Sequence, residues 1–256
     1  MQKIGAAKAT LEQEAKEKAG EQRAEAEQKL AERAEEERRT GKKKGGSKPE
    51  PPDPDKARPD DTAQRNFTDP ECRIMPDGAN MGSFVQGYNA QIAVDSASQV
   101  IVAAEVTQET NHKKQLLPMS ALIAANLEQN PEKVSADPGY FSEAKVTDGS
   151  VKQVDLYVAT GGDKHSVTVE ASSEPPPPGA SPKEAMREKL RTEAGRTVCK
   201  MRKAIAEPVF GQIKVQRGFR RFNLRGKENV SREWKLVCAV SNLLKLFRAS
   251  GVLEMA

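Results

Sequence analysis

The sequence predicts an α/β fold behind a charged N-terminal helix, and three observations lead to this class. Between residues 87 and 160, short segments rich in β-branched and apolar side chains flank one segment whose apolar residues have helical spacing. Longer helical segments follow in the C-terminal part of the chain. Residues 1–40 contain almost no large apolar side chain. The resulting order of strand, strand, helix, strand, strand and helix is typical of an α/β domain.

Residues 1–40 predict an exposed single helix or a weak coiled coil. Nine basic and ten acidic side chains nearly cancel. The composition favours helix, and oppositely charged residues three or four positions apart add a little stability. Leu11 and Leu30 are too few to form a heptad seam. Residues 41–65 are rich in Gly, Pro and charged residues and predict a disordered linker, in which Asp61 and Thr62 are solvated.

The folded domain is predicted to occupy residues 66–256. Within it, residues 87–108 predict a β-hairpin, and residues 113–129 predict a helix that packs against the hairpin. Residues 133–137 and 155–160 predict two further strands. A flexible insert is expected over residues 161–182, which contain four consecutive prolines, and a helix with a break near Gly195 over residues 183–206. The last helix, residues 231–248, is expected to be a core helix with these residues on one side: Trp234, Val237, Val240, Leu244 and Phe247.

Composition limits the class of protein. The chain has no apolar run close to the roughly 20 residues that a membrane span needs, and its N-terminus lacks the apolar centre of a secretory signal. The three cysteines are far apart in the sequence, and with only two histidines they do not suggest a zinc site. We therefore expect a cytoplasmic protein without a membrane partner, in the reduced state that is the default there.

Basic residues concentrate near the C-terminus. Between Cys199 and Lys235 there are eleven Lys or Arg residues against three Glu, a net charge of +8. Such a concentration indicates a polyanionic partner, and the aromatic residues Phe219 and Phe222 within it favour nucleic acid. The alternative is a basic surface that only contacts water.

Two acidic residues are candidates for a catalytic metal site. Asp137 follows a predicted strand and precedes Pro-Gly, and Glu207 lies on a later helix among basic residues. Carboxylates from a strand end and a helix suit a pair of hard cations, which cleave phosphodiesters by activating the attacking oxygen and stabilising the leaving one. Each residue also has a simpler interpretation: Asp137 as a turn residue, and Glu207 as the ion-pair partner of Lys203 or Lys214.

Several blocks of residues 66–248 together resemble one protein family. The blocks read NFTDPECRIM, GYNAQIAVD, ADPGYFSE, EPVFGQIK, FRRFNLRG and EWKLVCAVSNLLKL. They are similar to those of insertion-sequence DDE transposases, whose catalytic domain is RNase H-like. The resemblance implies that Asp137 is the second and Glu207 the third acid of the triad, each catalytic and a ligand of Mg²⁺ or Mn²⁺ in a two-metal site.

The resemblance also implies contacts with DNA. The family carries a Tyr–Arg–Glu–Lys signature that Arg202, Glu207 and Lys214 fit, with Cys199 in place of the tyrosine. His112 stands where an acidic residue is expected. The residues expected to contact phosphates are the basic ones of this region: Arg202, Lys203, Lys214, Arg217, Arg220, Arg221 and Arg225. The implied partners are double-stranded DNA, at element ends and at target sites, and a second copy of the chain in a homodimer.

The first acid of the triad has no counterpart in the sequence. In the family it lies on a central strand ahead of the hairpin, whereas Asp61-Thr62 is surrounded by prolines and Asp95 matches a different position. We therefore expect an RNase H-like mixed sheet with flanking helices, lacking its first strand. The predicted function is DNA transposition through metal-dependent cleavage and strand transfer, by an inactive or partial fragment in the bacterial cytoplasm, associated with the nucleoid when bound to DNA. Two alternatives remain: a non-catalytic basic DNA-binding remnant, and a helical adaptor that uses residues 1–40.

Overall fold

The computed structural model describes residues 2–41, 45–78, 80, 82–161 and 179–250. Most of the insert predicted over residues 161–182 lies outside these residues. The chain divides into two compact units, Met1–Pro70 and Glu71–Ala256. Among the described residues, no helix has both the length and the apolar character needed to cross a membrane.

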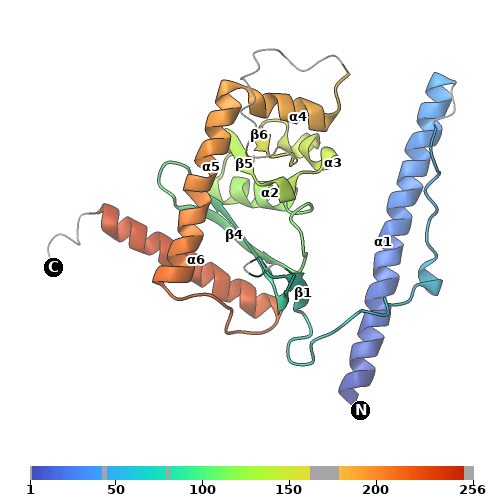
Figure 1. Cartoon of the computed structure of the whole chain (residues 1–256), viewed down its shortest axis with the longest axis horizontal. Helices are drawn as coiled ribbons and strands as arrows, with labels where there is room; N and C mark the ends of the chain where they lie inside the picture. The colour runs from blue at the N-terminus through green and yellow to red at the C-terminus, as the bar shows by residue number, and fades with distance from the viewer. Residues whose placement is uncertain (1, 42–44, 79, 81, 162–178, 251–256) are drawn as a thin grey trace. The chain divides into compact units, whose positions relative to one another are not determined.

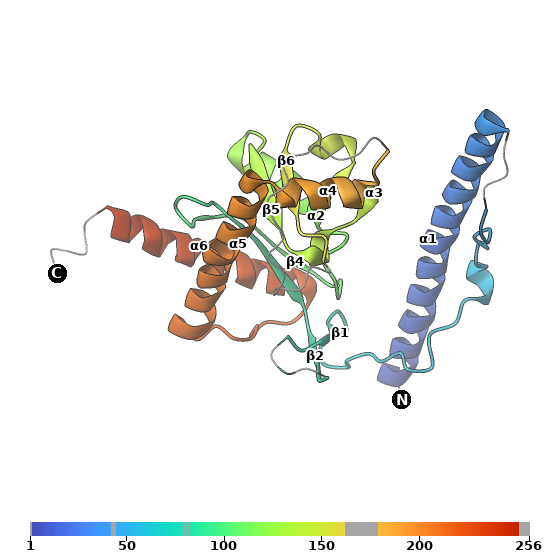
Figure 2. The same ribbon diagram turned by 45° about the horizontal axis from the view of Figure 1, so that its top comes forward.

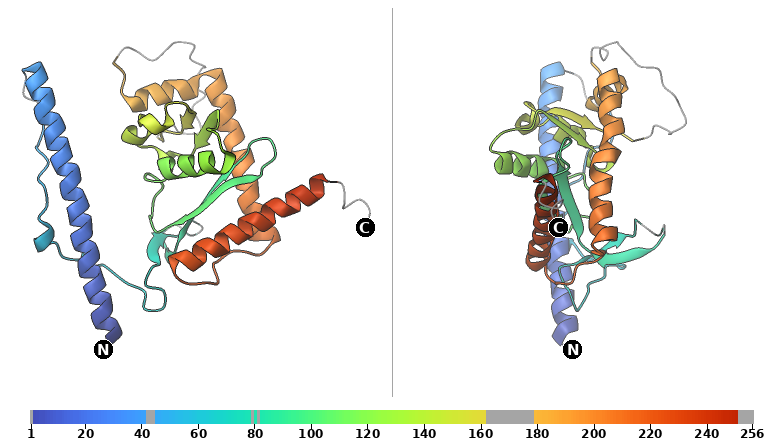
Figure 3. Two further views of the ribbon diagram at one scale, coloured as in Figure 1. Left: turned by 180° about the vertical axis from the view of Figure 1, so that it is seen from behind. Right: turned by 90° about the vertical axis from the view of Figure 1, so that its left-hand side faces the viewer.

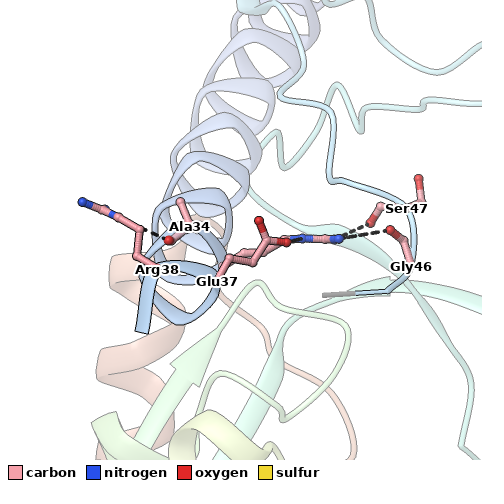
Figure 4. Close-up of polar contacts among 6 residues, drawn as sticks. Ala34, Glu37, Arg38, Gly46 and Ser47 are labelled. Atoms are coloured by element: carbon pink, nitrogen blue, oxygen red, sulfur yellow. Dashed lines mark hydrogen bonds and ion pairs between the residues drawn. The ribbon is translucent and has the colours of Figure 1, made fainter. Parts of the chain in front are cut away.

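The first unit is built on one long helix, α1 (Gln2–Thr40). Pairs of opposite charge four residues apart line it, such as Arg23 with Glu27 at 2.8 Å. The segment after α1, which includes a short 3-10 helix at Pro54–Lys56, returns along the helix (Figure 1). Arg33 donates hydrogen bonds to the carbonyl oxygens of Gly46 and Ser47 (Figure 4), so side chains of α1 hold the returning segment.

The strands of the second unit form three two-stranded sheets in the described part of the chain. β1 (Arg73–Pro76) and β2 (Phe84–Gly87) pair antiparallel, as do β3 (Asn89–Val94) and β4 (Ile101–Thr107). β5 (Lys133–Ala136) and β6 (Asp155–Val158) pair in parallel. The fold is thus mixed α/β, but its strands do not join into the single mixed sheet that the sequence led us to expect. The β1–β2 pair was not predicted.

Helices pack on the β3–β4 hairpin through alternate strand residues. Ala103 packs with Met119 and Ile123 of α2 (Leu116–Leu127). The neighbouring residue Ala104 packs in a second cluster with residues of α5 (Glu193–Gly211) and α6 (Lys227–Ala249). Since consecutive strand residues point to opposite faces, α2 and α5 cover the two faces of the hairpin, as Figure 3 shows.

The β5–β6 pair has a core of its own. Leu156 and Val158 of β6 are buried with Leu116 of α2 and Met186 of α4 (Pro182–Arg191). α4 and α5 lie beside this pair of strands (Figure 2). Short elements connect β5 to β6: a 3-10 helix at Pro138–Tyr140, α3 (Glu143–Val146) and a 3-10 helix at Gly149–Val151.

The last helix has a different exposure from the predicted one. It begins at Lys227, and Val230, Trp234, Cys238 and Ser241 are its buried residues. Val240, Leu244 and Phe247, expected on the core side, are 41%, 37% and 41% exposed. The prediction was wrong here because helical periodicity finds an apolar stripe without showing what covers it.

The predicted helix over residues 183–206 breaks at Thr192, three residues before the expected site. Thr192 ends α4 and caps α5, because its hydroxyl accepts a hydrogen bond from the backbone N–H of Gly195 at 3.0 Å. A β-carbon on Gly195 would lie 2.2 Å from the carbonyl oxygen of Lys189 and 2.7 Å from the Cα of Leu190. Glycine is therefore required by the close approach of two helix ends. α5 then continues through Glu207 and Pro208 to Gly211, followed by a π-helical turn at Gln212–Gln216.

We predict that Gly195→Ala destabilises the second unit by roughly 1–3 kcal/mol, since the atoms in the way are backbone atoms that cannot rotate aside. Urea denaturation followed by circular dichroism measures the change. Gly211→Ala is the matched control: its β-carbon meets no atom within 4 Å, and alanine favours helix over glycine by up to about 1 kcal/mol. Equal stability of the two variants would contradict the proposed packing.

Candidate active site and nucleic-acid interface

Asp137 directly follows β5 and is held by a cation from another element. The Nε of Arg202, on α5, lies 3.1 Å from Oδ1 of Asp137. The same guanidinium donates from Nη1 to the carbonyl oxygen of Ala136 at 3.0 Å. The Asp137 side chain is 66% exposed. Arg202 therefore braces the carboxyl end of β5, while the carboxylate stays open to solvent.

A partly buried polar cluster lies next to this turn. Gln91 of β3 is 1% exposed. Its Oε1 accepts a hydrogen bond from the hydroxyl of Tyr140, and its Nε2 lies 2.8 Å from Nδ1 of His112. The rings of His112 and Tyr140 stack with their centroids 4.9 Å apart. The cluster thus ties the Asp137 turn to the hairpin and to the segment before α2.

Burial sets the protonation states in this cluster. Burial lowers the pKa of His112, and the nearby Asp137 carboxylate opposes the shift. Burial, as the larger cause, and the Asp137 carboxylate, as the smaller one, raise the pKa of Tyr140 to about 12. The phenol therefore stays protonated and donates a hydrogen bond to Gln91. Since the amide Nε2 of Gln91 can only donate, Nδ1 of a neutral His112 accepts and its Nε2 carries the proton.

Sequence reasoning missed Gln91 and Tyr140 and left the role of His112 in doubt. The available signal was a polar side chain inside a strand: in NAQIAV, Gln91 lies on the same face as Ala93, which packs against α2. Alternation alone does not tell which face becomes buried, so the burial of Gln91 depends on where α2 packs.

We predict that Gln91→Leu destabilises the second unit by about 2–4 kcal/mol, because it leaves the Tyr140 hydroxyl and the Nδ1 of His112, both partly buried, without these hydrogen-bond partners. Chemical denaturation at pH 7.5 measures the change. Gln153→Leu is the control, since Gln153 is exposed and accepts a single hydrogen bond from Asn130; we expect a change within about 0.5 kcal/mol. A loss for Gln91→Leu as small as that of the control would refute the bonded cluster.

Glu207 lies on the solvent side of α5. Val209, two residues further on, is 0% exposed, and two residues turn a helix by about 200°. Glu207 is exposed, and no ion pair joins it to a described side chain. Of the two cations considered as partners, Lys214 lies over the ring of Phe210 at 5.5 Å. The side chain of Lys203 is outside the described part of the structure.

The described residues do not form a complete metal site. They contain no group of three or more His, Cys, Asp or Glu side chains that could hold a metal ion. Asp137 is paired with Arg202, and Glu207 leaves α5 about 140° around the helix from Arg202. A metal site shared by these two acids therefore stays a prediction. Asp95 also has a local role, because its carboxylate caps the hairpin turn and accepts a hydrogen bond from the N–H of Ser98 at 2.7 Å.

Residues 217–226, which we call the basic loop, join the π-helical turn to α6. The carboxylate of Glu233 holds this loop by accepting hydrogen bonds from the N–H groups of Asn223 and Leu224 at 3.0 Å. Phe219 and Phe222 point into the core, where their rings lie 6.3 Å and 6.2 Å from the ring of Trp234. The sequence offered these two rings as a sign of a nucleic-acid partner; in the structure they anchor the loop in the core.

The arginines between these anchors are exposed. Arg220, Arg221 and Arg225 are all on the surface of the basic loop, and Lys214 is exposed on the preceding turn. Arg217 differs from them, since its Nη1 donates to the hydroxyl of the fully buried Ser241 at 2.9 Å. The sequence RGFRRFNLRG therefore places its aromatic rings inside and three of its arginines outside, where they can reach phosphates.

One comparison with known proteins gave a match. Residues 163–247 match the family model of the transposase DDE domain. The matched segment includes Glu207, the basic loop and most of α6, while Asp137 lies before it. The match is consistent with the transposase blocks seen in the sequence and covers part of the chain. No curated protein and no solved structure gave a significant match.

Proposed function

We propose that this chain is part of a DDE transposase and that it acts in DNA transposition by binding DNA through its basic loop. The observation that carries the proposal is the family match over residues 163–247, which contain the exposed arginines of the loop. The partner is double-stranded DNA, at element ends and at target sites.

We assign the phosphate contacts to the exposed Lys and Arg side chains. Lys214, Arg220, Arg221 and Arg225 have no strong internal ion pair among the described residues and can approach a polyanion. We assign Arg202 and Arg217 a bracing role instead, since each is bonded within the fold. Lys203 stays a candidate from its position on α5. Contacts of this kind fix a protein on DNA without reading its sequence.

We predict weak, sequence-independent binding to duplex DNA that is steeply salt-dependent, with a log–log slope of roughly −3 to −4 for about four phosphate contacts. Replacing both Arg220 and Arg221 by alanine should reduce the size of the slope by about two, one per lost contact. Fluorescence anisotropy with a labelled duplex at several salt concentrations measures both quantities. The control is Lys133→Ala with Lys152→Ala, which removes two exposed lysines away from the loop and should leave the slope within error. A slope near zero, or equal slopes for the two double variants, would count against the loop.

We also propose a catalytic role for this chain. DDE transposases generally use divalent metal ions, and we propose Mg²⁺ or Mn²⁺ for this one. Asp137 and Glu207 would be the second and third acids of an RNase H-like core, and a first carboxylate has to come from another strand. Two observations support an added strand. In the described part of the chain, β3 pairs only with β4 and β5 only with β6. α5 also packs against both β3 and β5, and the Tyr140–Gln91 hydrogen bond links β3 to the 3-10 helix that follows β5.

We predict that this chain alone does not cleave element-end DNA, because two carboxylates leave a two-metal site without a bridging or terminal ligand. A nicking assay with Mg²⁺ or Mn²⁺ tests this, with and without a supplied fragment that carries an acidic first strand. Activity should need the fragment and be lost in Asp137→Ala and in Glu207→Ala, whereas Glu143→Ala, an exposed glutamate of α3, serves as the control. Cleavage by the chain alone that depends on Asp137 and Glu207 would show that the third ligand is already present.

A non-catalytic DNA-binding remnant is the second candidate function. It is favoured by the ion pair between Asp137 and Arg202, which occupies the carboxylate that a metal ion would need. The nicking assay separates the two candidates, because a remnant stays inactive when the fragment is supplied and still binds DNA through the basic loop.

A further inference from the structure

Glu233 is an acidic residue in the most basic part of the chain, yet no ion pair joins it to a described Lys or Arg side chain. Both of its carboxylate oxygens accept a hydrogen bond from the backbone N–H of Asn223, at 3.0 Å and 3.1 Å. The N–H of Leu224 and the side-chain amide of Asn223 each donate one more bond at 3.0 Å. The carboxylate is thus bonded to two consecutive residues of the basic loop and not to its arginines.

These bonds need the ionised form of the side chain. Burial alone would raise the pKa of Glu233, but the N–H groups of Leu224 and Asn223 outweigh burial and hold the pKa below its ordinary value. The side chain is therefore a carboxylate at neutral pH, with two oxygens that both accept. A glutamine in its place has one acceptor oxygen, and its NH₂ group would face the N–H donors of the loop. Glu233→Gln therefore removes part of the bonding together with the charge.

The backbone around Arg225 is held on both sides by carboxylates. Before it, the N–H of Leu224 donates to Glu233. After it, the N–H of Lys227 donates to Oε2 of Glu71 at 3.0 Å. An exposed arginine on a backbone that is fixed at both ends has only its own side-chain freedom to lose when it binds a phosphate. The acids beside the loop therefore act on its order, whereas the arginines supply its charge.

We propose that Glu233 is a positioning residue for DNA binding: its carboxylate increases the affinity of the basic loop for DNA, although it carries the same sign of charge as the phosphates. The inference rests on the proposed function, in which this loop contacts DNA. Two effects of the carboxylate oppose each other. Repulsion between charges that solvent and salt screen changes an affinity by about threefold. Ordering a single backbone residue on binding costs about tenfold, so the gain from an ordered loop is the larger effect.

Fluorescence anisotropy of the full chain with a labelled duplex compares Glu233→Gln with Glu228→Gln. Both substitutions remove one negative charge from α6. Glu228 is exposed and forms an ion pair with Arg232, so Glu228→Gln should bind DNA as tightly as the wild type or slightly more tightly. Glu233→Gln should bind about tenfold more weakly at each salt concentration. Its salt slope should stay within error of the wild type, because the same phosphates are contacted in the bound state.

Hydrogen–deuterium exchange of the variants without DNA separates positioning from general stability. Residues 217–226 should exchange faster in Glu233→Gln than in the wild type, with β3 and β4 unchanged. A purely structural role would instead speed exchange throughout the second unit and leave the DNA affinity of the folded protein unaltered. Asn223→Ala is a second variant, which changes no charge and removes one bond to the carboxylate. It should weaken DNA binding in the same direction by a smaller factor, about threefold.

Two results overturn the inference and separate it from the proposed function. If Glu233→Gln binds as tightly as Glu228→Gln or more tightly, while Arg220→Ala with Arg221→Ala still weakens binding, the loop contacts DNA but Glu233 does not position it. If the double arginine variant binds like the wild type, the proposed function and this inference both fail. Should Glu233→Gln not fold, unchanged binding by Asn223→Ala overturns the positioning role.

Discussion

The rest of the second unit depends on the hydrogen bond between Trp234 and Gln91. The indole Nε1 donates to the backbone carbonyl of Gln91 at 3.0 Å, and Trp234 is 3% exposed. Around the indole lie the rings of three residues: Phe210, Phe219 and Phe222. One side chain of α6 thereby joins the end of α5 and the basic loop to β3. Because the side chain of Gln91 is bonded to His112 and Tyr140, the same residue also reaches the Asp137 turn.

This arrangement explains how a mostly polar segment keeps a defined shape. The basic loop has no regular secondary structure over most of its length, yet two of its side chains are anchored in the aromatic cluster and its backbone is bonded to Glu233. Arg220 and Arg221 are therefore presented from a fixed backbone. Ordering a loop in advance lowers the conformational entropy lost on binding, so a few exposed arginines suffice for a phosphate-binding surface.

The sequence predicted local structure better than the arrangement of its parts. The hairpin, α2, β5 and β6 were found because β-branched runs and helical spacing are local signals. The break expected near Gly195 lies at Thr192, which caps α5, while Gly195 itself is needed where the two helix ends approach closely. The β1–β2 pair was missed because β1 (RIMP) contains a proline and β2 (FVQG) ends in a glycine, and both residues are uncommon in strands.

The sequence did not predict which hydrogen bonds and ion pairs its polar side chains form. The burial of Gln91 depends on α2 and on Tyr140, which follow it by many residues. The ion pair of Asp137 with Arg202 depends on α5 crossing the end of β5. The sequence singled out Glu207 because it is an acidic residue surrounded by basic ones. Only its angular position on α5 relative to the buried Val209 shows that it faces solvent. In the sequence, Phe219 and Phe222 could equally be core residues or residues that stack on bases. Their contacts with Trp234 show that they belong to the core.

The central claim is that an anchored basic loop forms the DNA-contacting surface of this protein. Hydrogen–deuterium exchange of the full chain, with and without duplex DNA at low salt, tests the claim most directly because it reports on every segment at once. The account predicts slower exchange in residues 214–226 on adding DNA, with no change in β5 and β6. Protection confined to α1, or no protection of residues 214–226 at concentrations where DNA is bound, would contradict it.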